Sequence, residues 1–365
     1  MIRYCLILII ILFISCNKEE GTAQETPPQP SMYFPPLSGN VWETTTPESL
    51  NWNISEADTL YDYLETRGTR AFIILKDGKI VIEKYWGNDI QNTSPFTQDS
   101  NWYWASAGKT LTALLVGIAQ EEGILNINNK TSDYLGLNWT SLPSEKEELI
   151  LIKHQLTMTT GLNYDVASLD CTDSSCLEYG TDAGQQWYYH NAPYTLLEQV
   201  VSNASGMTYN NFTDEKVENK IGMSGSWVTL GYNNVYWSTP RDAARYGLLL
   251  LNNGVWDETT VLADTSYVDA MTNSSQALNP SYGYLTWLNG KSSIRLPGFN
   301  LSFNTSLSLN APSDMYAAMG KNGQFINVVP SENMVVIRMG EAPDNDLVPI
   351  EFHDEMWGLI NNLTN

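Results

Sequence analysis

The stretch from Trp102 to Leu125 constrains the fold of this chain most. Three aromatic residues lead into a small-residue step, and apolar residues at helical spacing then run up to Gly123. This pattern predicts a helix that buries one face. Ser106 falls in the first turn of that helix and Lys109 follows three residues later. The two side chains therefore lie on the same side of the helix, about one turn apart, where they can meet.

A Ser-x-x-Lys pair can supply an activated nucleophile. The serine hydroxyl attacks a carbonyl only after a base takes its proton, and lysine serves as that base only where burial or nearby cations lower its pKa. The start of the helix adds free N–H groups where an oxyanion would form. The pattern alone is weak evidence, because Ser15 and Lys18 repeat it. On its own, Ser106 is better interpreted as a helix cap and Lys109 as a solvated residue.

Length and composition exclude several classes of protein. A chain of 365 residues with 42% hydrophobic residues can form one large domain with two lobes, or two ordinary domains. It carries 19 Lys and Arg against 41 Asp and Glu. Such an acidic surface repels phosphate backbones and anionic lipids, so we expect no nucleic acid partner and no membrane contact without a separate anchor.

The first 40 residues look like an export signal and a tether. Arg3 precedes an apolar run too short to span a bilayer, and residues 1–15 are predicted to be a signal peptide. Phe13-Ile14-Ser15-Cys16 resembles a lipobox, which implies lipidation of Cys16; the alternative is a plain signal peptide with a chance cysteine. Residues 16–40, polar and then proline-rich, would be the lipidated N-terminus and a flexible tether. The sequence thus predicts an exported protein, lipid-anchored on the periplasmic or surface face of a bacterial cell-envelope membrane.

The remaining chain predicts an α+β fold. β-Branched runs around Asp77-Gly78 indicate a hairpin over residues 71–83, the clearest in the chain. Since strands come first and last around a helical middle, the sheet should be completed by the two ends of the chain. Helices are expected at 56–66, 194–204, 241–252, 264–272 and 351–361, and strands at 281–288, 317–319, 325–329 and 334–339.

Cysteines and histidines indicate a disulfide but no metal site. Cys171 and Cys176 lie in a polar loop and, in an exported protein, are expected to pair. Two cysteines without nearby histidines do not make a zinc site, so we expect no metal. His154 and His353 are interpreted as structural residues.

A serine–lysine hydrolase needs a second proton carrier, and Tyr-x-Asn can provide one because a phenol near a lysine can accept and return the proton. This pattern occurs at Tyr189, Tyr209 and Tyr232. We favour Tyr189-His190-Asn191, which lies in a loop just before a predicted helix.

The third element, Lys-x-Gly on a strand beside the site, also has three candidates. Lys76 lies in the hairpin turn, Lys220 leads into a Gly/Ser loop, and Lys321 precedes the apolar run 325–329. Only this last run could lie edge-on to the nucleophile. Lys321 is therefore the favoured candidate, against the alternative of an exposed turn.

Taken in order, Ser-x-x-Lys, Tyr-x-Asn and Lys-x-Gly resemble the serine β-lactamase and penicillin-binding superfamily, in its class C-related branch. Leu156-Thr157-Met158-Thr159-Thr160-Gly161 and Gly320-Lys321-Asn322-Gly323-Gln324 look like its esterase and 6-aminohexanoate-dimer hydrolase members. The resemblance implies a β-lactamase/transpeptidase-like α+β fold in one catalytic domain, residues 41–362. An α/β lobe would comprise 41–105 and 281–362, and a helical lobe 106–280.

The resemblance also implies roles for site residues. Ser106 would attack a carbonyl, with Lys109 and Tyr189 relaying its proton, and no cofactor or metal is implied. The N–H groups of Ser106 and Gln324 would form the oxyanion hole. Substrate would be bound by Asn191, Lys321, Gly323 and Gln324. His190 departs from the family pattern, in which a small residue is common.

The substrate would be a small ester, amide or short peptide. Two alternatives stay open: a β-lactamase or D-amino-acid peptidase acting on cell-wall-type substrates, and a surface lipoprotein that binds peptidoglycan or glycan without turnover.

Overall fold

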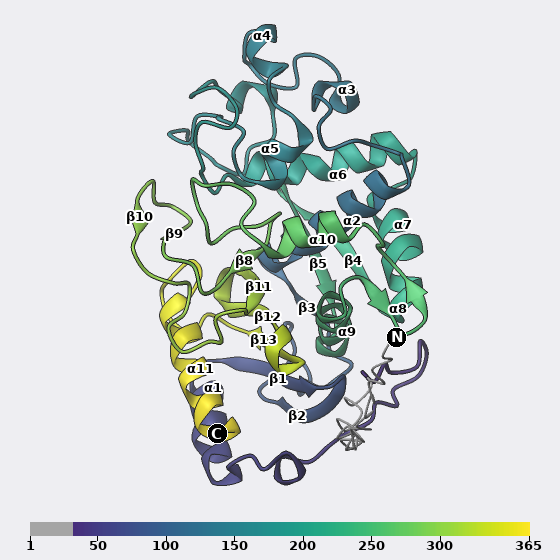
Figure 1. Cartoon of the computed structure of the whole chain (residues 1–365), viewed down its shortest axis with the longest axis vertical. Helices are drawn as coiled ribbons and strands as arrows, with labels where there is room; N and C mark the ends of the chain where they lie inside the picture. Colours follow the sequence, from purple (N-terminus) through teal and green to yellow (C-terminus); the bar gives the residue numbers. More distant parts are fainter. Residues whose placement is uncertain (1–31) are drawn as a thin grey trace, which may run out of the picture. The chain divides into compact units, whose positions relative to one another are not determined.

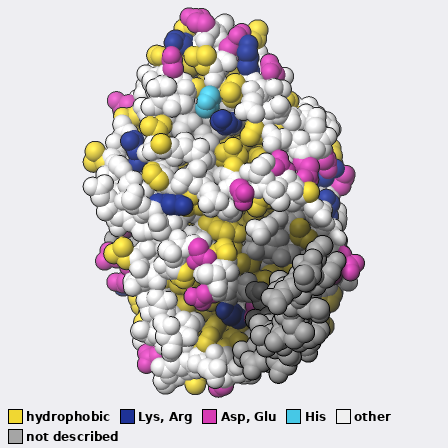
Figure 2. All heavy atoms as spheres, viewed as in Figure 1, with side chains coloured by type: hydrophobic (Ala, Val, Ile, Leu, Met, Phe, Trp, Pro, Cys, Tyr) yellow, Lys and Arg dark blue, Asp and Glu magenta, His cyan; other side chains and the backbone are white. Residues whose placement is uncertain are grey.

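The computed structural model describes residues 32–365, so the predicted signal peptide, Cys16 and most of the tether lie outside the described residues. Met32–Asn365 forms one compact unit. Within it, no helix is long and apolar enough to cross a membrane. Figure 2 shows acidic side chains spread over the viewed face, in keeping with the acidic composition.

A six-stranded sheet is built from both ends of the chain (Figure 1). The predicted hairpin is present, since Asp77 and Gly78 take φ of 50° and 82° between its two strands. The last strand pairs antiparallel with the first and aligns Ile73 with Ile337, which confirms that the chain ends meet. In sheet order the strands are β2 (Lys79–Tyr85), β1 (Thr69–Lys76), β13 (Met334–Gly340), β12 (Gln324–Val329), β11 (Tyr316–Gly320) and β8 (Trp287–Leu288).

Helices cover both faces of this sheet. Phe325 stacks on Phe352 of α11 (Ile350–Thr364), whereas a Cβ placed on Gly247 of α9 (Pro240–Leu251) would lie 3.2 Å from a methyl group of the next residue, Ile326. Successive residues of a strand point to opposite faces, so α11 and α9 lie on opposite sides. Helix α1 (Ala57–Thr66) packs beside α11, as Figure 1 shows.

The middle of the chain forms the helical part, around α2 (Gly108–Glu121). This helix is buried on nearly every side, because α6 (Asn191–Ser205) packs against it and Gly108 and Gly117 let Trp227 and Tyr267 approach its backbone closely. The other helices are α3 (Ser132–Leu135), α4 (Ser144–Glu147), α5 (Ile152–Leu156), α7 (Tyr209–Thr213), α8 (Asn219–Ile221) and α10 (Thr265–Thr272).

Two expectations about strands were wrong. Of the strand predicted over 281–288, only Trp287–Leu288 pairs with β11, because Leu285 has a left-handed φ of 51° that interrupts extended backbone. The predicted helical middle also contributes two strands to an unforeseen three-stranded sheet, in the order β3 (Trp102–Tyr103), β5 (Asn233–Ser238) and β4 (Gly225–Leu230). Two short pairs, β6 (Val255–Trp256) with β7 (Thr259–Thr260) and β9 (Ile294–Arg295) with β10 (Ser302–Phe303), complete the strands.

Candidate active site

Ser106 lies on a tight turn between β3 and α2. It is the middle residue of a single 3₁₀ turn, Ala105–Ala107, and its side chain is partly exposed. Ala105 has φ of 48°, a left-handed value that costs free energy for a residue with a Cβ. Two hydrogen bonds to β5 fix the residue that precedes the turn: Trp104 N donates to Tyr236 O at 2.8 Å, and the Trp104 indole donates to Ser238 Oγ at 2.8 Å. The strained turn thus presents Ser106 just ahead of the N-terminus of α2.

Lys109 lies where the Ser-x-x-Lys spacing predicts. Its Nζ lies 2.9 Å from Ser106 Oγ, and the residue is only 3% exposed. The ring centroids of Tyr194 and Tyr189 lie 4.1 and 4.9 Å from Nζ. Burial lowers the pKa of Lys109 to about 7, and the negative charge of Asp170 partly offsets this shift. A large fraction of the amine is therefore neutral near pH 7, as a general base requires.

Tyr189 lies two residues before the start of α6, and its hydroxyl also lies close to Ser106. Its ring stacks on Trp287 with centroids 5.8 Å apart. Burial raises the pKa of Tyr189 well above its ordinary value, and a hydrogen bond with Ser106 only partly offsets that rise. The phenol is therefore neutral at physiological pH, so Lys109 is the better candidate for the base, with the Tyr189 hydroxyl passing the proton on.

The two competing Tyr-x-Asn matches lie elsewhere. The Tyr209 hydroxyl donates to Thr112 Oγ1 at 2.9 Å inside the helical part. The exposed Tyr232 hydroxyl donates to Asp173 Oδ2 at 2.6 Å. Neither hydrogen bond involves Ser106, so the geometry favours the match at Tyr189.

Asn191 is the first residue of α6 and has a partner that the sequence did not suggest. Its Nδ2 donates to Asp170 Oδ1 at 2.7 Å, and its Oδ1 is buried without a hydrogen-bond partner. Asp170 belongs to none of the sequence motifs described above. The only signal in the sequence is its place directly before Cys171.

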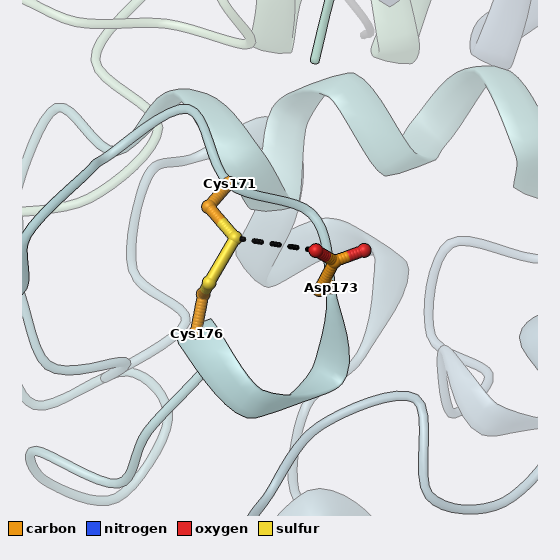
Figure 3. A group of neighbouring side chains, drawn as sticks. All are labelled: Cys171, Asp173 and Cys176. Atoms are coloured by element: carbon orange, nitrogen blue, oxygen red, sulfur yellow. Dashed lines mark hydrogen bonds between the residues drawn. A yellow bond between two sulfur atoms is a disulfide. The ribbon is translucent and has the colours of Figure 1, made fainter.

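The expected disulfide between Cys171 and Cys176 is present. Figure 3 shows it with Asp173, whose Oδ2 lies 3.8 Å from Cys171 Sγ. This group of three is not a metal site, because both sulfur atoms are already bonded to each other.

The third predicted motif lies in a turn. Lys321 is exposed, in the 3₁₀ turn Lys321–Gly323 that links β11 to β12. Gly323 has φ of 75°, and its carbonyl accepts from Arg338 Nη1 at 3.1 Å. The Gln324 side chain bridges to the backbone of Gly340, donating to its oxygen at 2.7 Å and accepting from its nitrogen at 3.0 Å. The carbonyl of Gly323 and the side chain of Gln324 are therefore already engaged within the protein, which leaves them little capacity to bind substrate.

The end of β11 lies directly against the Ser106 turn, and β12, which contains the predicted run 325–329, also contacts this turn. A Cβ placed on Gly320 would lie 2.5 Å from Trp104 O and 3.0 Å from Ser106 N. Because only a glycine permits this approach, the end of β11 fits directly against the Ser106 turn. Three residues of β11, Ala318-Met319-Gly320, occupy this stretch, and they include no basic side chain.

Comparisons with known proteins agree with this architecture. The sequence model of the Beta-lactamase family matches residues 62–346. An uncharacterized protein of Alkalihalophilus pseudofirmus is 24% identical over an alignment of 324 residues, and the match covers 80% of this chain and 88% of that protein. Penicillin-binding protein 4* of Bacillus subtilis is 27% identical over an alignment of 232 residues, and the match covers 58% of this chain but only 48% of that protein.

A solved structure from Bacillus anthracis, described as a 6-aminohexanoate-dimer hydrolase, has the same fold. It superposes with a TM-score of 0.67 at 16% identity and covers 91% of this chain and 89% of its own. The β-lactamase/transpeptidase-like fold expected from the sequence is confirmed.

Proposed function

Because this chain belongs to the Beta-lactamase family of serine hydrolases, we propose that it cleaves an ester or amide bond through an acyl-enzyme intermediate on Ser106. The observation that carries the proposal is the 2.9 Å contact between Lys109 Nζ and Ser106 Oγ, made by a lysine that burial keeps partly neutral. A solvated lysine beside a helix cap, the alternative interpretation, would not be 3% exposed.

In this mechanism neutral Lys109 takes the Ser106 proton as Oγ attacks the carbonyl carbon. The oxyanion would accept from the N–H groups of Ser106 and Gln324, and single donors of this kind are worth about 3 to 4 kcal/mol in other enzymes. Tyr189 passes a proton to the leaving group. Water activated by the same pair then releases the acyl group and restores Ser106.

The walls of the site favour a linear ester or amide over a β-lactam. β-Lactams carry a carboxylate, yet β11 has no basic residue near Ser106 and Lys321 is exposed in the turn beyond it. An acidic group, Asp170, is instead close enough to Lys109 for its charge to raise the pKa of the amine. We therefore place β-lactamase activity, and D-amino-acid peptidase activity on substrates with a C-terminal carboxylate, second.

A fluorophosphonate probe tests the proposal and its non-catalytic alternative. We expect a mass shift on Ser106, hydrolysis of p-nitrophenyl esters, and loss of both in Ser106→Ala with the melting temperature nearly unchanged. An unlabelled wild-type protein with an intact fold would support the binding protein, and activity in Ser106→Ala would disprove the assignment.

We also propose that the protein is exported and lipid-anchored at Cys16, on the evidence of the first 16 residues. Metabolic labelling with an alkyne fatty acid should mark the wild type but not Cys16→Ala. Equal labelling of both proteins would reject the anchor.

A further inference from the structure

Two neighbouring residues close to Lys109, His190 and Asn191, have buried polar atoms without partners, and Asp170 lies beside them. His190 is 3% exposed, and neither of its ring nitrogens makes a hydrogen bond. The side-chain oxygen of Asn191 is likewise buried and unpaired. Because buried polar atoms are nearly always hydrogen-bonded, this cluster indicates a place where a ligand supplies the missing partner.

Asp170 is fixed in the cluster by three separate links. The preceding carbonyl, of Leu169, accepts from Ala192 N at 2.8 Å, Asn191 Nδ2 donates to the carboxylate at 2.7 Å, and the following residue, Cys171, is held by the disulfide. The carboxylate lies close enough to Lys109 and His190 to raise the pKa of both side chains, against the lowering that burial causes. Asp170 is thus a positioned charge at the site.

The cluster offers mainly hydrogen-bond acceptors. The carboxylate of Asp170 must face the amide nitrogen of Asn191, since two oxygens would repel each other, and this orients Asn191 Oδ1 away as a free acceptor. Burial lowers the pKa of His190 to about 4, so its ring is neutral near pH 7 and has one acceptor nitrogen. A carboxylate oxygen, an amide oxygen and an imidazole nitrogen together match the three N–H donors of an ammonium group.

Building on the proposed acyl-transfer function, we propose that Asp170, His190 and Asn191 form a subsite for a protonated amine close to the scissile carbonyl. The substrate class is then an amino-acyl ester or amide with a free amine. The negative charge of Asp170 excludes a carboxylate from this position, in keeping with the lack of a basic residue on β11. Asp170 also lies at the N-terminus of α6, where a carboxylate stabilises the helix dipole, so the test must separate recognition from stability.

Matched esters provide that test. The methyl esters of alanine (D and L) and of β-alanine share one analogue without the amine, methyl propionate. We expect wild-type kcat/KM for at least one amino ester to exceed that for methyl propionate by about 10- to 100-fold, the range for one charge-assisted hydrogen bond. Asp170→Asn keeps the shape and should reduce this ratio to within a few-fold of one, whereas a merely stabilising Asp170 would leave the ratio unchanged. Asp165→Asn, which removes an exposed carboxylate from the same segment, is the matched control and should keep the wild-type ratio.

A second measurement needs no turnover. Propylammonium should slow fluorophosphonate labelling of Ser106 more than 1-propanol does, and Asp170→Asn should remove the difference. Equal protection by the two compounds, or a wild-type ratio near one, would overturn the amine subsite while leaving the acyl-enzyme proposal intact. Failure of Ser106 to react with the probe at all would instead reject the proposed function, and the subsite with it.

Discussion

The rate at which Ser106 is acylated should rise with pH, with a midpoint near 7. Only neutral Lys109 can accept the serine proton, and burial lowers its pKa from the ordinary 10.5 to about 7. This lowering of the pKa corresponds to a free energy of about 5 kcal/mol. At pH 7 about half of the buried amines would be neutral, compared with about one in 3,000 for an ordinary lysine.

Labelling of Ser106 by a fluorophosphonate, followed by intact mass spectrometry between pH 5.5 and 9.5, measures this midpoint directly. Asp170→Asn should move it to lower pH, since the Asp170 charge favours the ammonium form of Lys109. A labelling rate that is flat, that falls with pH, or that has its midpoint above about 9 would refute Lys109 as the base.

The same shift makes a prediction about stability. Between pH 7 and 10.5 the unfolded chain holds a proton on Lys109 that the folded protein has released, so wild-type stability should rise with pH in this window. Lys109→Met should therefore stabilise the fold, by up to about 5 kcal/mol at or below pH 7 and by less as pH approaches 10.5. Chemical denaturation at pH 6.5 and 9.5 checks the sign, and a stability gain that grows with pH would contradict the reasoning.

Three further predictions concern the surroundings of Ser106. Tyr189→Phe should lower kcat by about 10² to 10⁴ with the fold preserved, whereas Tyr232→Phe should stay within a few-fold; the reverse result would move the proton carrier. Gly320→Ala should destabilise the fold by about 1 to 3 kcal/mol and impair labelling of Ser106, because its Cβ would lie 2.5 Å from a backbone oxygen; normal labelling would mean that β11 does not fix the turn. Reduction of the Cys171–Cys176 bridge should lower the free energy of unfolding by about 2 kcal/mol or less, measured by melting with and without reductant. A larger loss would show that the bridge stabilises more than its own short loop.

Local signals predicted the parts of the site that local geometry determines. Ser106 and Lys109 meet because residues three apart share a helix face, and the Asp77-Gly78 turn specified its hairpin within a few residues. The role of Lys321 stays a prediction, because the sequence does not say how the two strands of a hairpin pack against the nucleophile. That packing depends on Gly320 fitting against Trp104, more than 200 residues earlier in the chain.

Asp170 was missed for a related reason. Its role follows from the contact with Asn191 and from the bridge at Cys171, both of which form only in the folded loop. Part of the three-stranded sheet, in contrast, could have been predicted from the sequence. Gly231-Tyr232 between two alternating runs is a hairpin signal that the helical pattern of the flanking segments obscured.

The insertion of β13 between β1 and β12 sets an order of events during synthesis. Strand β1 emerges early, but its partner β13 comes close to the end of the chain, so one edge of the first hairpin has unpaired backbone until synthesis is nearly complete. Such an edge can pair with other chains, and contacts this distant in sequence form slowly. Strand β11, which completes the surroundings of Ser106, also comes late. Ser106 and Lys109 are therefore synthesised long before the strands that surround them, and we expect the proposed hydrolysis to begin only when the C-terminal strands have joined the sheet.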